Sequence, residues 1–105
     1  MPEITTGFQG QTVITTFEVT PGTAQDVLEA LVNAYENVIR HQAGFLGAGL
    51  HINDAQTRIC NYSQWQRRED YLAMLRTGEM RDRNRRINEL CKGFEPVMYD
   101  VQAVF

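Results

Sequence analysis

Two neighbouring segments in the middle of the chain carry the side chains best suited to bind and polarise a small molecule. Residues 45–52 alternate in character, and one face of this predicted strand contains two glycines, Gly47 and Gly49. Glycine inside a strand often marks the close approach of a ligand or of another backbone. Residues 58–65 form a second predicted strand that includes Asn61, an amide that strands usually lack. A buried carboxamide needs partners for both its oxygen and its nitrogen, so these strands predict a polar binding site.

The turn at residues 53–57 predicts an antiparallel hairpin in which Phe45 faces Trp65 and His51 faces Ile59. Directly opposed residues lie on the same face of a sheet. This register therefore gathers the candidate lining residues on the face of the two glycines: Phe45, Gly49, His51, Asn61, Ser63 and Trp65. A slip by one residue would move the side chains of one strand to the opposite face, so the grouping depends on the register.

Ordinary structural roles compete with a functional interpretation at these positions. A tryptophan at the end of a strand commonly packs in a core, and a lone histidine on a strand is commonly bonded to a backbone carbonyl. Asn61 is harder to explain in this way, because a buried amide is costly without partners. The arginine-rich segment 80–86 also has two interpretations. It fits a solvated helix face, or a cationic pocket wall that holds a phenolate or carboxylate.

Several classes of reaction lack the residues that they require. The sequence has no GxSxG motif and no glycine-rich loop before a helix that could hold phosphate. Cys60 and Cys91 do not form a CxxC motif, and the two histidines, His41 and His51, are too few for most metal sites built by protein side chains. We therefore expect no metal, and an enzyme with this sequence would act through hydrogen-bond donors and shape.

The composition is typical of one globular domain without a membrane or nucleic-acid partner. The chain has 105 residues, of which 43% are hydrophobic and 22% are charged. No apolar run approaches the roughly 18 residues that a membrane-spanning helix needs, and the N-terminal residues do not resemble a secretory signal. The net charge of −3 argues against a general nucleic-acid binder. We expect a cytoplasmic protein with reduced thiols.

The spacing of apolar residues predicts four strands and three helices. They follow one another as a loose arm at residues 1–10, a strand at 11–19, a helix that starts at Thr23 and ends at Gly44, hairpin strands at 45–52 and 58–65, helices at 67–76 and 79–91, and a strand at 97–105. This order predicts an α+β fold, a ferredoxin-like βαββαβ sandwich with a single domain over residues 11–105. Helices would cover only one sheet face, so we expect the other face to pair with a second copy in a homodimer, forming a dimeric α/β barrel.

One stretch of the sequence resembles a known family. Residues 61–71, with the sequence NYSQWQRREDY, follow a Gly44-Phe45-Leu46 segment and a Pro21-Gly22 turn before the first predicted helix. In this combination the chain resembles the antibiotic biosynthesis monooxygenase superfamily over residues 11–105. Within it, the chain is most similar to the small cofactor-independent quinone-forming monooxygenases of aromatic polyketide biosynthesis.

The resemblance implies an activity and a site. The activity is the oxidation by O2 of a polycyclic aromatic polyketide, of anthrone or naphthacenone type, to a quinone without a cofactor. The implied site consists of Asn61, Trp65, Tyr71, His51 and an arginine from the second short helix, best matched by Arg85. A helical wheel places Arg83 nearer the apolar stripe, so the choice between the two arginines stays open.

The expected roles follow from the chemistry of the side chains. Asn61 and the Trp65 indole N–H would donate to a developing oxyanion, and the Tyr71 hydroxyl would protonate a peroxide intermediate. His51 and Arg85 would orient the substrate, with Phe45, Gly49 and Ser63 as further binding residues. Two alternatives remain at this point: a polyketide cyclase on the same fold, and a dimeric ligand-binding protein without catalytic activity.

Overall fold

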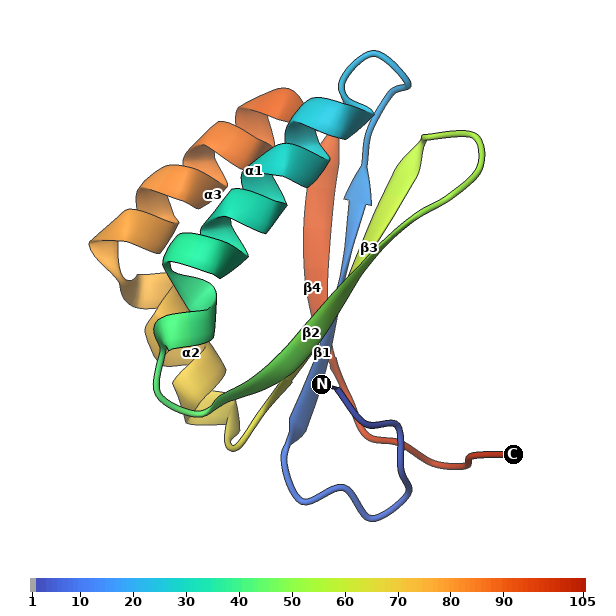
Figure 1. The fold of residues 1–105 in the computed structure, drawn as a ribbon, viewed down its shortest axis with the longest axis vertical. Helices are drawn as coiled ribbons and strands as arrows, with labels where there is room; N and C mark the ends of the chain where they lie inside the picture. The colour runs from blue at the N-terminus through green and yellow to red at the C-terminus, as the bar shows by residue number, and fades with distance from the viewer. Residues whose placement is uncertain (1) are drawn as a thin grey trace.

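The computed structural model describes residues 2–105, and four antiparallel strands form one sheet in the order β2-β3-β1-β4. The elements follow the chain as β1 (Gln11–Glu18), α1 (Ala24–Asn37), the 3-10 turn η1 (Ile39–His41), β2 (Phe45–Ile52), β3 (Arg58–Trp65), α2 (Arg68–Arg76), α3 (Gly78–Leu90) and β4 (Gly93–Tyr99). All three helices lie on one side of the sheet (Figure 1). The predicted ferredoxin-like βαββαβ fold is confirmed.

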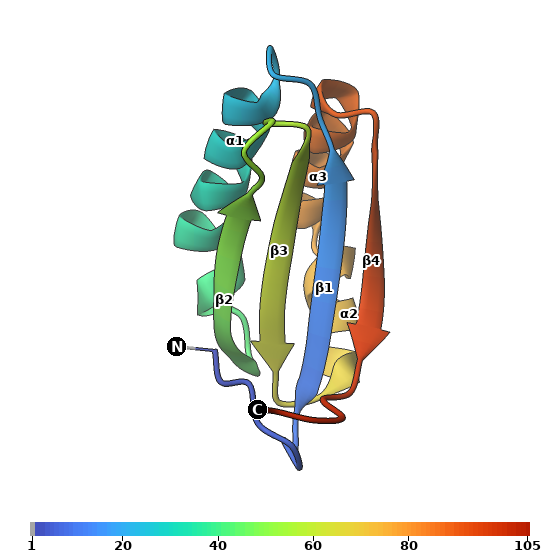
Figure 2. The same ribbon diagram turned by 90° about the vertical axis from the view of Figure 1, so that its right-hand side faces the viewer.

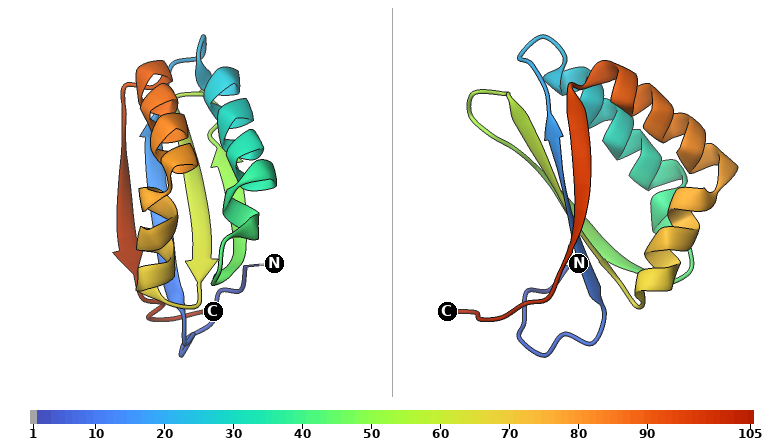
Figure 3. Two further views of the ribbon diagram at one scale, coloured as in Figure 1. Left: turned by 90° about the vertical axis from the view of Figure 1, so that its left-hand side faces the viewer. Right: turned by 180° about the vertical axis from the view of Figure 1, so that it is seen from behind.

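The two faces of the sheet differ in what covers them. Figure 2 shows the strands in front with the helices behind them, and the left view of Figure 3 shows α1 and α3 lying across the opposite face. We call the helix-covered side the inner face and the other side the outer face. Along β1 the inner residues Val13, Thr15 and Phe17 are buried, whereas Thr16 and Glu18 on the outer face are exposed. This alternation is the period of two that a strand imposes on its side chains.

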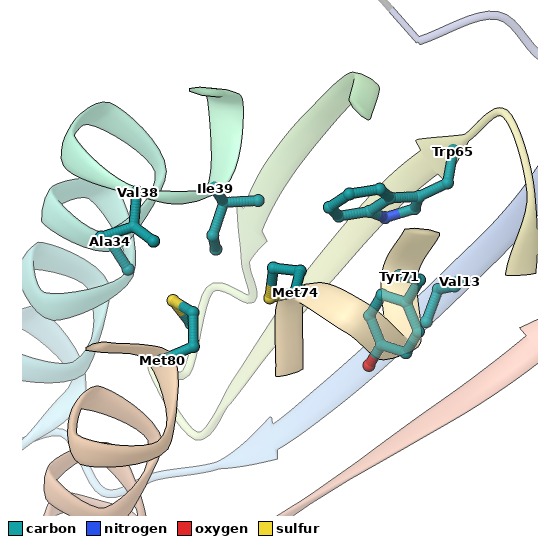
Figure 4. Close-up of a cluster of buried hydrophobic side chains, with 8 residues drawn as sticks. All are labelled: Val13, Ala34, Val38, Ile39, Trp65, Tyr71, Met74 and Met80. Carbon is teal, nitrogen blue, oxygen red and sulfur yellow. The ribbon is translucent and has the colours of Figure 1, made fainter. Parts of the chain in front are cut away.

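Two groups of buried side chains hold the helices on the inner face. One consists of Phe17, Val19, Ala24, Val27, Leu31, Ile59 and Ile87. The other, drawn in Figure 4, consists of Val13, Ala34, Val38, Ile39, Trp65, Tyr71, Met74 and Met80. Each group joins β1 and β3 to at least one helix, so the burial of apolar surface fixes the helical layer on the sheet.

The register of the β2–β3 hairpin differs from the predicted one. Asn53 pairs with Arg58 across the turn, and the Asn53 side-chain oxygen accepts hydrogen bonds from the backbone N–H groups of Thr57 and Arg58 at 2.9 and 2.8 Å. This shorter loop offsets the pairing by one residue, so His51 lies opposite Cys60. A β-bulge between Phe45 and Gly47 then restores the predicted pairing of Phe45 with Trp65. The predicted register is therefore wrong for every pair between the bulge and the turn.

Two other boundaries were predicted incorrectly. The first helix ends at Asn37, and Gly44 lies beyond the 3-10 turn, with a backbone φ of +84° that favours glycine. The last strand begins at Gly93 and ends at Tyr99, because it pairs with β1 from Glu18 to Thr12. Thr12, the partner of Tyr99, is only the second residue of β1, which begins at Gln11. The alternating residues after Tyr99 therefore have no strand to pair with.

The N-terminal arm is attached to the outer face through Gln64. Gln64 lies on that face, its side chain is almost completely buried, and it exchanges two hydrogen bonds with the backbone of Glu3. The first residue of the predicted arm lies outside the described residues. In the described part of the chain, no helix combines the length and the apolar character needed to span a bilayer.

Ile59 provides a test of this packing. It lies on the central strand β3 with no exposed surface, so Ile59→Ala should lower the free energy of unfolding by about 2–5 kcal/mol. The measurement is urea denaturation followed by circular dichroism. Ile4→Ala is the matched control, because 60% of Ile4 is exposed, and its effect should stay below about 0.5 kcal/mol. Equal effects of the two substitutions would contradict this account of the core.

Candidate active site

A cavity of about 220 Å³ lies between the inner face of the sheet and the helices. Strands β1, β3 and β4 form its floor, and α1, α2 and α3 form its walls. The lining residues are Thr15, Phe17, Leu31, Tyr35, Ile39, Asn61, Ser63, Tyr71, Met74, Leu75, Met80, Asn84, Phe94 and Pro96. Among these described lining residues none has a carboxylate, an imidazole or a cationic group. The cavity is therefore apolar with a few uncharged hydrogen-bonding groups, which is the usual character of a small-molecule site.

Tyr35 and Asn61 form the shortest polar contact of the cavity. Tyr35 projects from α1, and its hydroxyl donates a hydrogen bond of 2.6 Å to the Oδ1 atom of Asn61 on β3. Burial raises the pKa of Tyr35 to about 12. Tyr35 thus stays protonated at neutral pH, and its hydroxyl fixes the orientation of the Asn61 amide.

Trp65 lies behind the cavity wall and reaches it through Ser63. The indole is completely buried, and its Nε1–H donates to the Ser63 Oγ atom at 3.2 Å. The Ser63 hydroxyl in turn donates to the backbone carbonyl of Val13 at 3.4 Å. The partners of Trp65 and Ser63 are therefore supplied by the protein itself, and this relay sets the direction of the Ser63 hydroxyl.

Four aromatic rings follow one another across the inner face. The ring centroids of Tyr35 and Phe45 lie 5.9 Å apart, those of Phe45 and Trp65 lie 5.4 Å apart, and those of Trp65 and Tyr71 lie 5.8 Å apart. The last two pairs meet edge to face. Such spacings are typical of favourable aromatic pairs, so this row holds both cavity tyrosines in place.

Tyr71 places a second phenol at the cavity. It extends from α2 toward β1 beside Trp65 and Val13, as Figure 4 shows. Burial raises the pKa of Tyr71, and a hydrogen bond with Thr15 lowers it in part. Its hydroxyl is therefore protonated at neutral pH and can act as a proton donor.

The structure brings together five of the eight residues that the sequence assigned to the site. Asn61, Ser63 and Tyr71 line the cavity, and Phe45 and Trp65 lie directly behind it in the aromatic row. Phe45 lies on the inner face because the bulge between Phe45 and Gly47 restores its predicted pairing with Trp65.

Gly49 and His51 lie on the outer face, away from Asn61. The offset register pairs them with Tyr62 and Cys60, whose side chains point away from the helices. The space above Gly49 is bounded by the His51 ring, since a Cβ atom there would lie 3.5 Å from His51 Nε2. The predicted grouping of these two residues with Asn61 is therefore wrong, and its cause is the one-residue offset of the hairpin.

Neither candidate arginine lines the cavity. The Arg85 side chain is 72% exposed and lies 3.6 Å from the Asp82 carboxylate on the same helix. Arg83 donates a hydrogen bond of 2.7 Å to Asn33 of α1, on the outside of the helical layer. On α3, the residue that faces the cavity is Asn84. The structure thus favours the solvated helix face for the arginine-rich segment.

Three polar lining residues were missed by the sequence analysis: Thr15, Tyr35 and Asn84. Each lies on the apolar face of a predicted strand or helix, or at the edge of that face. A hydrogen-bonding group on an otherwise apolar stripe was the available signal, because such a group requires a buried partner.

The site can donate hydrogen bonds and a proton to a molecule held in an apolar space. Among residues 2–105 no three His, Cys, Asp or Glu side chains lie together in a group that could hold a metal ion. The chemistry available from the lining residues is therefore that of amide, hydroxyl and phenol groups.

Comparison with known proteins identifies the family. The family model described as antibiotic biosynthesis monooxygenase matches residues 11–86, which is more than half of the chain. The chain belongs to the antibiotic biosynthesis monooxygenase family. The resemblance stated from residues 61–71 is thus confirmed.

A curated relative and two solved structures are similar to the chain. The tetracenomycin-F1 monooxygenase of Streptomyces glaucescens is 33% identical over 63 residues, which are 60% of this chain and 56% of that protein. The chain thus spans little more than half the length of this relative. A monooxygenase from the ActVA-Orf6 gene of Streptomyces coelicolor has been solved in complex with nanaomycin D. It matches this chain with a TM-score of 0.81 at 23% sequence identity, and the match covers 99% of this chain and 97% of the Streptomyces chain.

SnoaB, a cofactor-independent oxygenase from Streptomyces nogalater, matches this chain with a TM-score of 0.73 at 14% sequence identity. The match covers 91% of this chain and 96% of the SnoaB chain. At these identities the structural matches show a common fold. They place the cavity of this family member on a scaffold shared with oxygenases.

The raised pKa of Tyr35 predicts a pH dependence of stability. In the unfolded chain this phenol titrates near its ordinary value of 10.0, whereas in the folded protein it titrates near 12. The unfolded state therefore loses its proton first, so the stabilising contribution is complete below pH 10 and is lost as the pH rises from 10 toward 12.

The free energy of unfolding of Tyr35→Phe should therefore fall less than that of the wild type between pH 10 and pH 12. Part of the pH dependence should remain in both proteins, because the pKa of Tyr71 is also raised. The measurement is urea denaturation at a series of pH values on both sides of pH 10. An identical fall in the two proteins would show that Tyr35 is not the titrating group.

Proposed function

We propose that this protein is a cofactor-independent monooxygenase that uses O2 to convert a polycyclic aromatic polyketide, of anthrone or naphthacenone type, to a quinone. The observation that carries the proposal is the cavity itself, which offers uncharged hydrogen-bond donors in an apolar space next to an aromatic row. Such a site suits a flat phenol whose own electrons reduce O2. Membership of a monooxygenase family and the likeness to a cofactor-independent oxygenase support the same conclusion.

The reaction balances without a cofactor because the substrate supplies the electrons. An anthrone-type phenol has an acidic methylene, and loss of one proton gives an electron-rich anion. This anion transfers electrons to O2 and forms a C–O bond, which gives a hydroperoxide after protonation. The hydroperoxide carbon then loses its remaining proton as the O–O bond breaks, so the terminal oxygen leaves as water and the carbonyl of the quinone is formed. The role of the protein is to favour the anion and to keep water from the reacting carbon.

The lining residues have distinct roles in this scheme. The Asn61 amide donates to the phenolate oxygen and stabilises the negative charge that develops there. The Tyr71 hydroxyl donates the proton that converts the peroxide to the hydroperoxide. Trp65 is a positioning residue, because its indole N–H acts on the cavity through the Ser63 hydroxyl.

Asn61→Ala tests the central assignment. Removal of one preorganised donor to an oxyanion should lower kcat by roughly 10²–10³-fold, as measured by O2 uptake with dithranol as substrate. Asn88→Ala is the matched control, since Asn88 is an exposed residue of α3 and should leave kcat unchanged. An Asn61→Ala protein that folds normally by circular dichroism and keeps the wild-type kcat would refute the donor role.

The same assay separates the proposed function from its competitors. A cyclase would convert a polyketide substrate without O2 uptake, and a binding protein would give neither product nor O2 uptake. The purified active protein should show no flavin or haem absorbance and contain no metal. Activity that depends on a bound flavin, haem or metal ion would contradict the cofactor-free mechanism.

We further propose that the protein is a homodimer joined through the outer face of the sheet. This face carries Ile14, Tyr62 and Val97 on three adjacent strands, each only half-buried within one chain. The helices lie on the opposite side, so a second copy could cover these residues and close the barrel (Figure 2).

Tyr62→Glu places a charge at the centre of this face. In sedimentation velocity experiments the wild type should behave as a dimer, whereas Tyr62→Glu should behave as a monomer, because a buried unpaired carboxylate is costly. Ala73→Glu is the control, since Ala73 is exposed on α2 and its variant should remain dimeric. A wild-type protein that sediments as a monomer would refute the proposal.

A further inference from the structure

A second apolar hollow adjoins the candidate active site. It has a volume of about 370 Å³ and lies between α1 and the edge strand β2. Its apolar lining includes Val32, Phe45, Leu46, Ala48 and Leu50. The charged groups of the described lining are Glu36 and Arg40, one of each sign, so the hollow does not favour an ion. Its chemistry fits the uncharged, flat part of an aromatic molecule.

Tyr35 lines both spaces and forms part of the wall between them. It projects from α1 with its ring 5.9 Å from that of Phe45, and its hydroxyl is bonded to Asn61. A change of the Tyr35 rotamer would break this hydrogen bond and join the two spaces. The same movement would leave the Asn61 Oδ1 atom without its donor, so opening of the wall and exposure of this acceptor to a ligand would occur together.

The sizes of the spaces indicate what they hold. The inner cavity of about 220 Å³ is smaller than the range of roughly 300–1,000 Å³ that is typical of small-molecule sites. Joined to the outer hollow, it falls within that range. A substrate with four fused rings therefore needs both spaces, with its reacting ring beside Asn61 and its distal part between α1 and β2.

We propose that the hollow between α1 and β2 is the subsite for the distal rings of the substrate, and that Tyr35 is the gate between this subsite and the reacting ring. This proposal rests on the proposed function for the identity of the ligand. It predicts a preference for longer ring systems that is determined by residues remote from Asn61 and Tyr71.

Binding without O2 tests the subsite separately from catalysis. The chain has a single tryptophan, and Trp65 lies beside the cavity, so quenching of its fluorescence reports ligand binding. The probes are dithranol, with three fused rings, and a hydroxylated naphthacenone, with four, under anaerobic conditions. Because no turnover is required, this experiment can succeed even if O2 uptake is never observed, which would refute only the proposed function.

Val32→Phe adds bulk to the outer hollow at a position that is 40% exposed, so folding should tolerate it. It should weaken naphthacenone binding roughly tenfold or more and change dithranol binding by less than about twofold. Gln25→Phe is the matched control on α1, because Gln25 is exposed and outside the hollow, and it should leave both affinities unchanged. Equal effects of Val32→Phe on the two probes, no effect on either, or no binding to the wild type would overturn the proposal.

Tyr35→Phe tests the gate. Loss of the hydrogen bond to Asn61 should make the open rotamer more populated, so stopped-flow quenching should show naphthacenone associating roughly two- to tenfold faster. A purely structural role for the Tyr35 hydroxyl would leave the association rate unchanged or lower it, and either result would contradict the gate.

Discussion

The pairing of β2 with β3 is the constraint on which the candidate site depends. Side chains alternate between the faces of a strand, so the pairing determines which polar groups of the hairpin meet under the helices. The turn at Asn53 offsets the pairing, and the bulge near Leu46 corrects it at Phe45. As a result, the inner face receives Asn61 and the aromatic row without an imidazole. The cavity has hydrogen-bond donors but no strong base, and this limits the reactions that it can support.

Desolvation gives these uncharged groups their strength. The Tyr35–Asn61 hydrogen bond and the relay from Trp65 through Ser63 to the Val13 carbonyl lie between a sheet and a helical layer that exclude water. Electrostatic interactions are stronger in such surroundings than in water, and the donors do not have to reorient when charge develops. An apolar space with a few oriented donors thus stabilises an anionic ligand without a cationic side chain. This explains why the exposed position of Arg85 is compatible with the proposed chemistry.

Local patterns predicted much of the fold, and features that depend on tertiary contacts limited the prediction of the site. Alternation predicted both hairpin strands to the residue, and the strand–helix order predicted the ferredoxin-like arrangement.

The bulge at Leu46 was not predictable, because it depends on how two strands accommodate each other. The last strand was misplaced because its length is determined by β1. The bond from Tyr35 to Asn61 was not predictable, because it depends on where α1 crosses β3. Arg85 was assigned by resemblance, whereas the helical wheel already placed it away from the apolar stripe.

The contact between Gln64 and Glu3 has a consequence for how the N-terminal arm can vary. Gln64 is bonded to the N–H and C=O groups of Glu3, and those groups are the same in nearly every amino acid. The buried amide therefore binds the main chain at residue 3, whichever side chain that residue has. Proline is the exception, since it lacks the N–H. A substitution of Glu3 by any residue other than proline therefore leaves both hydrogen bonds possible and keeps the arm at the same place on the sheet.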